Sequence, residues 1–386
     1  MPEPLSEPLL DDPLALLVVL AVVVLVALKL EARVTLFRSL GAALVGILIG
    51  MLLSNLGVIP GESSVYDFLQ GTGVNIGIVL ILTSVNVRSV VEAGPSMLAA
   101  FAIGAFGTGL GAMVAGLVLL RQIGDETWKL AGQFTGTYTG GGVNFAALGR
   151  AFDTSSDLFT AALAADVILT AIWMAACLAI PVLLGKRKQD LAHETETSGA
   201  PVTLERSLYS SGRAVPLADA AALVVIAVGA VWVAGALAER VPVLPEVLWL
   251  TSVALIAAQL PPVKRLAGGA MIGNYLVLLF LACNGAQSVI QNIVKVGPAV
   301  FYFACITVAI HGVVIFGVGR VMKLDIGTLA IASQANVGGA GSAMAMASAR
   351  GYGDRLLPGV AVGLAGYAAG NYLGFAVATI MRSILA

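Results

Sequence analysis

Charged side chains are scarce in this sequence of 386 residues. Only 11% of the residues are Asp, Glu, Lys or Arg, while 59% are hydrophobic, whereas soluble domains carry about 25% charged residues. So few charges cannot cover the apolar surface of a water-soluble fold, but a lipid bilayer accepts apolar faces. The net charge of −1 lacks the basic excess that phosphate binding requires, which argues against nucleic acid as a partner.

Cysteine is also rare, and its spacing carries no pattern. Cys177, Cys283 and Cys305 lie inside apolar stretches and fit neither a disulfide framework nor a zinc site. We interpret them as small buried hydrophobic residues and expect no structural metal and no cofactor other than bound sodium. The acidic N-terminus MPEPLSEPLLDDP lacks the basic segment of a secretory signal, so the first apolar run is expected to remain as a membrane helix.

Phosphate loops and paired deep carboxylates are absent from the sequence as well. No Gly-x-x-x-x-Gly-Lys-Ser/Thr motif occurs, which argues against an ATP-driven pump. The Gly351-Tyr352-Gly353-Asp354 stretch matches the pattern of intramembrane aspartyl proteases, but Asp354 lies in a loop between two arginines. An aspartyl dyad needs two carboxylates at one site, so we do not expect an enzyme.

Long apolar runs are abundant, and a spanning helix needs about 20 mostly apolar residues. Ten runs qualify or nearly qualify: residues 13–28, 40–56, 66–84, 97–120, 158–184, 215–237, 244–260, 268–283, 300–321 and 356–380. The sequence therefore predicts an all-α integral membrane protein with about ten transmembrane helices, placed in the cell inner (plasma) membrane.

Two glycine-rich segments, 132–152 and 329–351, are too polar to span comfortably. Each follows the fourth apolar run of its half and carries a central cluster, Gly140-Gly141-Gly142 or Gly338-Gly339-Ala340-Gly341. Glycine permits a tight unwound turn. Non-helical backbone at membrane depth is tolerated only where it is buried in protein or lines a cavity. We predict that both segments are re-entrant hairpins.

The two halves share one order of elements: three helices, a Gly-Pro turn, a fourth helix, a hairpin and a fifth helix. The first repeat would cover 1–184 and the second 214–386, joined by a polar linker, 185–213, that we expect to be cytoplasmic. If both termini are outside, fifteen of the 21 basic residues fall on the inner side, as the positive-inside rule requires. If both glycine-rich segments crossed the membrane instead, the five basic residues of the linker would lie outside. We therefore predict two inverted five-helix repeats.

Inverted-repeat transporters place their sites where discontinuous helices meet. Helix N-termini at the hairpin tips offer N–H groups to an anion, and the opposing C-terminal ends offer carbonyls to a cation. Hydroxyl and amide side chains surround both glycine clusters. The predicted substrate site comprises Thr137, Thr139, Gly140, Gly141, Gly142, Asn144, Gln334, Asn336, Gly338, Gly339 and Ser342. The alternative is that these glycines only permit close packing while the polar groups satisfy the backbone.

Asp166 is the only acidic residue deep inside an apolar run. A charge at that depth costs roughly 2.5–3.5 kcal/mol, which makes function the default interpretation. We predict that Asp166 binds a coupling sodium ion or carries a proton, with Tyr138 and Ser333 in the same ion-coupling site. The alternative is a structural aspartate that is protonated or hydrogen-bonded. His311, alone in an apolar run, is interpreted as structural, and Gly366-x-x-x-Gly370-x-x-x-Gly374 as a packing face.

These motifs carry a resemblance. The stretches GTYTGGGVNFAAL, LFTAALAADVILTAIW, SQANVGGAGSAMAMASARG and LLPGVAVGLAGYAAG resemble those of the YjcL-like membrane proteins, catalogued as a domain of unknown function, over nearly the whole chain. The tips are more distantly similar to the Gly-Gly-x-Gly tips of sodium/glutamate symporters and 2-hydroxycarboxylate transporters. Gly338 to Gly341 match that tip, and Gly140 to Val143 depart at the last position. The resemblance implies a ten-helix scaffold-plus-transport homodimer that moves small anionic solutes with sodium or protons.

We therefore expect a cation-coupled secondary transporter of a small organic solute, such as an amino acid, short peptide or carboxylate, with elevator-type alternating access. The third to fifth and eighth to tenth helices, with both hairpins, would form the moving part, and the other four helices the scaffold and dimer contact. The alternative is a sodium/proton antiporter without organic substrate, for which Asp166 alone would suffice. The hydroxyl- and amide-rich tips favour an organic ligand.

Overall fold

The computed structural model describes residues 8–184, 215–241 and 244–385, and every regular element in these ranges is helical. The first half comprises α1 (Pro13–Arg33), α2 (Thr35–Asn55), α3 (Ser64–Phe68), a π-helical turn η1 (Leu69–Gly73), α4 (Val74–Leu82), α5 (Val87–Glu92), α6 (Pro95–Ile123), α7 (Thr127–Gly140), α8 (Gly142–Ala151) and α9 (Ser156–Leu184). The second half comprises α11 (Leu217–Arg240), α12 (Glu246–Gln259), a short turn η2 (Val263–Arg265), α13 (Gly269–Ala286), α14 (Ile290–Val321), α15 (Ile326–Val337), α16 (Gly339–Ala349) and α17 (Gly353–Leu385). The linker 185–213, with its predicted cytoplasmic side, lies outside the described residues.

The apolar runs of the sequence coincide with these helices, so the all-α membrane class is confirmed. Eight helical stretches in the described ranges are long and apolar enough to cross a membrane. The runs 40–56 and 244–260 fall instead on shorter apolar helices, Gly41–Asn55 and Glu246–Gln259. Gly41 shortens the first of these because its φ of 74° breaks α2 at that residue.

Helix ends follow from local sequence. The Asp12 side chain accepts a hydrogen bond from the Ala15 N–H at 2.9 Å, while Pro13 occupies the first turn of α1, where its missing N–H costs nothing. α6 likewise begins at Pro95 directly after Gly94, whose φ is 85°. Asp325 caps the start of α15, where its side chain accepts a hydrogen bond from the Thr328 N–H.

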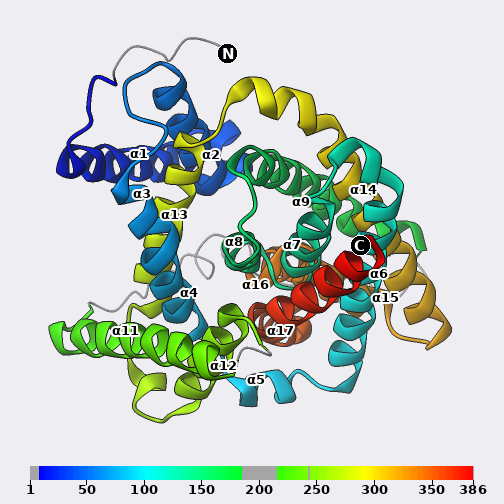
Figure 1. Ribbon diagram of the computed structural model, residues 1–386. Helices are drawn as coiled ribbons and strands as arrows, with labels where there is room; N and C mark the ends of the chain where they lie inside the picture. The colour runs from blue at the N-terminus through cyan, green and yellow to red at the C-terminus, as the bar shows by residue number, and fades with distance from the viewer. Residues whose placement is uncertain (1–7, 185–214, 242–243, 386) are drawn as a thin grey trace.

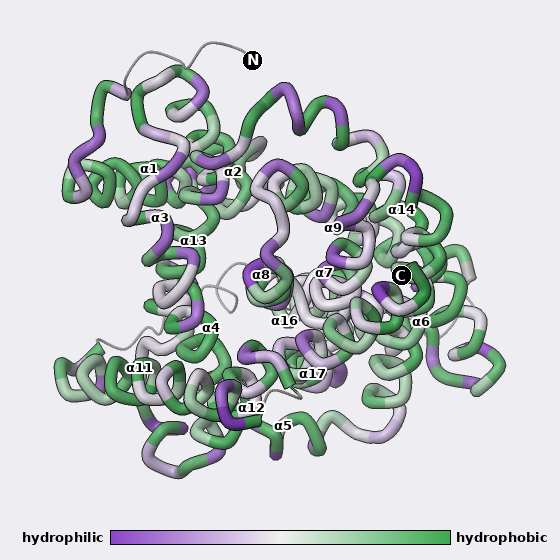
Figure 2. The backbone as a smooth tube through the Cα atoms, in the orientation of Figure 1, coloured by the Kyte–Doolittle hydropathy of each residue, from purple (hydrophilic) through white to green (hydrophobic). Residues whose placement is uncertain are grey.

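The helices form two groups (Figure 1). In the flanking group, α13 packs against α2 and α4, α1 packs against α2, and α11 packs against α12 and α4. In the broken-helix group, α6 packs against α14, α7 against α17, and α9 against α14 and α15. Figure 2 shows mostly hydrophobic colour along α1 and α11, whereas α7 and α16 near the middle are paler.

The third and eighth membrane segments, α3–α4 and α13, pack in the flanking group, whereas we expected them, from the sequence, to group with the helices that carry the two hairpins. The physical reason is a backbone contact between α4 and α13. A Cβ atom on Gly77 would lie 2.9 Å from the Gly273 carbonyl oxygen, and one on Gly273 would lie 2.5 Å from the Gly77 oxygen. Two helices this close bury their faces against each other and not against the broken helices.

Candidate functional site

Two helices of the broken-helix group are interrupted at the predicted glycine clusters. The chain passes from α7 to α8 through Gly141, whose φ is 97°, and from α15 to α16 through Gly338 and Gly339, whose φ is 76°. Positive φ at these two positions is readily adopted only by glycine. None of the four helices exceeds 14 residues, which is less than a span requires.

The two interruptions meet in space. A Cβ atom on Gly141 would lie 3.8 Å from the Gly339 Cα, and one on Gly339 would lie 3.4 Å from the Gly140 carbonyl oxygen. Tyr367 of α17 borders both positions, with its ring 3.7 Å from a Cβ on Gly141. The N-terminal ends of α8 and α16, with their free N–H groups, therefore converge on one place, together with the C-terminal ends of α7 and α15.

One edge of this meeting point is open. Gly142 is exposed, and Gly338 and Ser342 are partly exposed, although their neighbours in α7 and α15 are buried. The Ser342 hydroxyl folds back toward Gly338, where a Cβ atom would come within 2.3 Å of it. A small molecule at this edge would contact backbone and hydroxyl groups first.

A glycine seam holds α7 against α17. Its members are Gly132, Gly136 and Gly140 on α7 and Gly366, Gly370 and Gly374 on α17. A Cβ atom on Gly140 would lie 2.1 Å from the Gly366 backbone, and one on Gly374 would lie 2.6 Å from the Gly132 carbonyl oxygen. No side chain fits between the two backbones, so the predicted packing role of the α17 glycines is confirmed. Gly140 takes part in the same close contact.

The predicted polar residues of both tips are buried, and several keep atoms without a hydrogen-bond partner. Thr137, Thr139, Asn144, Gln334 and Asn336 are each 0% exposed. The amide N–H groups of two of them are used: Asn144 donates to the Gly366 carbonyl at 2.8 Å, and Asn336 donates to the Phe101 carbonyl at 3.1 Å.

The unpartnered atoms among the described residues include the Thr139 hydroxyl, both amide atoms of Gln334, and the side-chain oxygens of Asn144 and Asn336. Leaving such an atom buried and unpaired costs about 1–3 kcal/mol. Unpaired polar groups concentrated where two broken helices meet are typical of a site whose ligand completes the hydrogen bonds.

Asp166 lies on α9 beside the first tip and is 8% exposed. The Thr137 hydroxyl donates to one carboxylate oxygen at 3.4 Å, and the Thr170 hydroxyl donates to the other at 3.4 Å. Tyr138 lies near the same carboxylate, but its hydroxyl has no hydrogen-bond partner among the described residues. No Lys or Arg of the described ranges lies within 4.0 Å of the carboxylate, so two threonine hydroxyls bond a carboxylate that has no basic partner.

The structure places Ser333 elsewhere, in a hydrogen-bonded chain with His311. Because the Gly104 carbonyl can only accept, His311 Nδ1 carries the hydrogen at 2.9 Å, and Nε2 accepts from the Ser333 hydroxyl at 2.9 Å. The Trp173 indole N–H donates to the same Ser333 oxygen at 2.9 Å. Tyr138 and Asp166 are therefore together, as predicted for the ion-coupling residues, whereas Ser333 contacts a different part of α9.

His311 is buried with all its hydrogen bonds made, and its removal has a measurable consequence. We expect His311→Phe to lower the stability of the folded protein by about 1–3 kcal/mol, because the Ser333 hydroxyl and the Gly104 carbonyl each lose a buried partner. The melting temperature of purified protein in detergent, followed by tryptophan fluorescence, measures this. Thr379→Ala, on the exposed surface of α17, is the control, and equal melting temperatures for His311→Phe and wild type would contradict the structural role.

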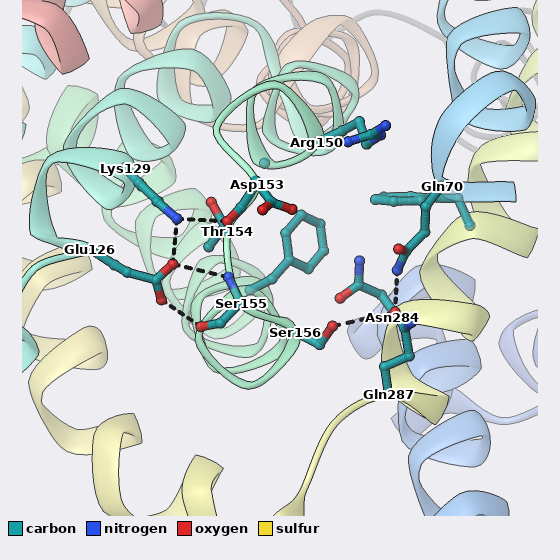
Figure 3. Close-up of a pocket in the computed structure, with 13 residues that line it drawn as sticks. Gln70, Glu126, Lys129, Arg150, Asp153, Thr154, Ser155, Ser156, Asn284 and Gln287 are labelled. Atoms are coloured by element: carbon teal, nitrogen blue, oxygen red, sulfur yellow. Dashed lines mark hydrogen bonds and ion pairs between the residues drawn. The ribbon is translucent and has the colours of Figure 1, made fainter. Parts of the chain in front are cut away.

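A second polar feature was not predicted. A cleft of about 490 Å³ lies between the α8–α9 connection on one side and η1 and the end of α13 on the other (Figure 3). At one end, Lys129 Nζ lies 2.6 Å from Glu126 Oε1, and the Ser155 hydroxyl donates to Glu126 Oε2 at 2.5 Å. Burial alone would raise the pKa of Glu126, but hydrogen bonds from Lys129 and Ser155 bring it below its ordinary value. Glu126 and Lys129 thus form a closed ion pair.

The sequence is similar to known membrane proteins over almost its whole length. It is 29% identical over 384 residues to a Bacillus subtilis (strain 168) protein described as "Uncharacterized membrane protein YjcL", covering 94% of this chain and 96% of that protein. A family model described as "Protein of unknown function (DUF819)" matches residues 15–384. Both matches include the two interrupted helix pairs and Asp166. The chain is a multi-pass membrane protein that belongs to the DUF819 family.

Proposed function

We propose that this protein is a cation-coupled secondary transporter of a small organic solute, with the solute at the meeting point of the two interrupted helix pairs and the cation at Asp166. The observation that carries the proposal is the convergence of the two tips, with their unpartnered polar atoms, beside a buried carboxylate that has no basic partner. A structural aspartate would be expected to have a basic or strongly donating neighbour.

The solute site combines groups of both polarities. The N-terminal ends of α8 and α16 supply N–H groups and positive dipole ends for an anionic group. The side chains of Gln334, Asn336 and Thr139 supply the remaining donors and acceptors. A bare ion exchanger has no need of these amide and hydroxyl groups, which favours an organic solute over a sodium/proton antiporter.

The coupling cation is sodium or a proton, either of which neutralises the Asp166 carboxylate. Oxygen ligands of the carboxylate and hydroxyl type suit a hard cation, and Thr137 and Thr170 each place a hydroxyl next to the carboxylate. Thr137 also belongs to α7, the helix that ends at the first tip. A cation bound at Asp166 would therefore stabilise the arrangement of the tip that holds the solute.

Inverted repeats are supported by the helix contacts. In chain order, α1, α2, α4, α7 and α9 of the first half correspond to α11, α12, α13, α15 and α17 of the second. When each helix is replaced by its counterpart, one observed contact becomes another: α1–α13 becomes α11–α4, α2–α9 becomes α12–α17, and α7–α17 becomes α15–α9. A two-fold relation between the halves produces this pattern. With an odd number of crossings per half, the second half would enter the membrane from the opposite side, and both interrupted pairs would be re-entrant hairpins.

Elevator-type access is supported by the separation into two groups. The broken-helix group holds both tips, Asp166 and the glycine seam, and it touches the flanking group through smaller contacts such as α2–α9 and α4–α8. We propose that the broken-helix group moves against the flanking group, which would form the dimer contact in the inner membrane.

Uptake into proteoliposomes tests the function. Purified protein is reconstituted, and accumulation of radiolabelled amino acids and small carboxylates is followed with an imposed sodium or proton gradient. Gradient-dependent accumulation of a solute is the expected result. Cation exchange that proceeds without any organic solute, reported by a trapped pH-sensitive dye, would instead support the antiporter.

The topology makes a separate prediction. Cysteines introduced at Ser64, which is exposed beside the start of α3, and at Ser198 in the linker should lie on opposite sides of the membrane. An impermeant thiol reagent applied to intact cells is expected to label the first and not the second, with labelling after lysis as the control. Equal labelling of both in intact cells would contradict the inverted arrangement.

A further inference from the structure

The cleft shown in Figure 3 holds two charged side chains, Arg150 and Asp153, that no described residue neutralises. Glu126 and Lys129 are paired with each other at 2.6 Å. Arg150 and Asp153, which also line the cleft, make no side-chain hydrogen bond or ion pair with any described residue, and they are not within 4.0 Å of each other. Within the part of the chain that the structure describes, one exposed cation and one exposed anion therefore lie unpaired in a single cleft.

The two charged residues lie at the C-terminal end of α8 and just beyond it. Arg150 is in the last turn of α8 and extends toward η1, because its guanidinium lies 3.9 Å from the position of a Cβ atom on Gly71. Asp153 follows α8 with a φ of 51°, and its backbone carbonyl accepts a hydrogen bond from Lys129 at 2.6 Å. In Figure 3 the Asp153 carboxylate lies between Lys129 and Arg150 in the view.

The remaining walls are amide and aromatic. The side chains of Gln70 and Gln287 are hydrogen-bonded to each other, and Asn284, which is 5% exposed, keeps its side-chain oxygen unpartnered among the described residues. Phe159 and Phe280 contribute an edge-to-face pair of rings with centroids 5.7 Å apart. The cleft thus offers a cation, an anion, a buried amide oxygen and an apolar surface.

We propose that this cleft captures an amino acid in its zwitterionic form, with an apolar side chain. The α-carboxylate would bind Arg150, whose planar guanidinium suits a carboxylate, the ammonium group would bind Asp153 and Asn284, and the side chain would lie on Phe159 and Phe280. A simple carboxylate would leave Asp153 without a partner, and a simple amine would leave Arg150 without one. This inference rests on the proposed transport function and names its substrate class.

A row of neighbouring aromatic rings begins at Phe159 in the cleft and ends at Tyr138, near Asp166. The centroids of Phe159 and Phe145 are 4.7 Å apart, those of Phe145 and Phe134 are 6.2 Å apart, and those of Phe134 and Tyr138 are 5.5 Å apart. Phe159 and Asp166 are seven residues apart on α9, which is about 10 Å along a helix axis. In this proposal the cleft is a first binding site, and the row of rings leads from it toward Tyr138 and Asp166.

Binding to the purified full-length protein in detergent tests the inference. The probes are L-leucine, 4-methylpentanoate, which lacks the ammonium group, and 3-methylbutylamine, which lacks the carboxylate. Isothermal titration is expected to show binding of leucine and at least about tenfold weaker binding of the other two, since each loses a charged hydrogen bond. Equal affinity for leucine and 4-methylpentanoate, or no binding of leucine, would overturn the zwitterion site.

Variants of the charged cleft residues test whether leucine binds in this cleft. Arg150→Gln and Asp153→Asn are each expected to weaken leucine binding at least about tenfold, and asparagine keeps the positive φ of residue 153. Arg121→Gln and Asp125→Asn, at exposed residues in the last turn of α6 and in the α6–α7 connection that do not line the cleft, should bind like wild type. Undiminished binding by the double variant of Arg150 and Asp153 would overturn the assignment. Gradient-driven uptake of some other solute in proteoliposomes would leave the transport proposal standing in that case.

Discussion

Asp166→Asn is expected to abolish concentrative uptake while leaving a folded protein. Asparagine keeps the shape of the side chain, and its amide oxygen can accept from one of the two hydroxyls, Thr137 or Thr170, while its amide NH2 donates to the other, at the positions 3.4 Å away that the carboxylate oxygens serve. It loses the negative charge that would hold sodium and the site that would carry a proton. A tenfold cation gradient is worth about 1.4 kcal/mol, so wild type could accumulate solute about tenfold per coupled cation. The variant should stop at equal concentrations on both sides.

A counterflow measurement distinguishes loss of coupling between solute and cation from loss of all transport. Proteoliposomes loaded with unlabelled solute should still exchange it for labelled solute through the Asp166→Asn variant, because the tip residues that would bind the solute are unchanged. Asp125→Asn, an exposed aspartate outside the site, serves as the matched control. Should Asp166→Asn concentrate solute as well as wild type, Asp166 is structural, and the backbone carbonyls at the ends of α7 and α15 become the alternative coupling site.

The sequence is sufficient for features that depend on neighbouring residues. Apolar runs locate the helices because a membrane helix needs only composition over about 20 residues. The glycine clusters locate both interruptions because positive φ at Gly141 and Gly339 is a local requirement. Asp166 is recognisable from its depth, and its neighbours Thr137 and Tyr138 lie on the neighbouring interrupted helix.

Features that depend on how distant helices face each other were not predictable in the same way. His311, Ser333, Trp173 and Gly104 come from four different helices, and only their contacts reveal the chain between them. The cleft likewise combines Gln70, Arg150 and Gln287 from three separate elements.

The packing of α4 against α13, which differs from the grouping expected from sequence, has a signal in the sequence. Gly73-x-x-x-Gly77 and Gly269-x-x-x-Gly273 have the small-residue spacing of helix contacts. The α4–α13 backbone contact through Gly77 and Gly273 is what places these helices in the flanking group.

Gly339→Leu is expected to abolish transport with little loss of folded protein. The φ of 76° costs a non-glycine residue about 1–2 kcal/mol, which a stable helical protein tolerates. The larger effect is local, because the new Cβ would lie 3.4 Å from the Gly140 carbonyl oxygen. The rest of the leucine side chain would occupy the meeting point of the two tips, where the solute is proposed to bind.

Variants at two other glycines distinguish a loss of transport at the tip from a loss of helix packing. A Cβ atom on Gly317, exposed on α14 away from the tips, has nothing within 4 Å, and its φ is not positive, so Gly317→Ala should fold and transport like wild type. A Cβ atom on Gly140 would lie 2.1 Å from the Gly366 backbone, so Gly140→Leu should lose folded protein as the α7–α17 seam opens. Size-exclusion chromatography reports folding, and proteoliposome uptake reports transport. If Gly339→Leu behaved like Gly140→Leu, with no folded protein recovered, the tip would be a packing contact. A folded Gly339→Leu protein that transports normally would place the solute away from the tips.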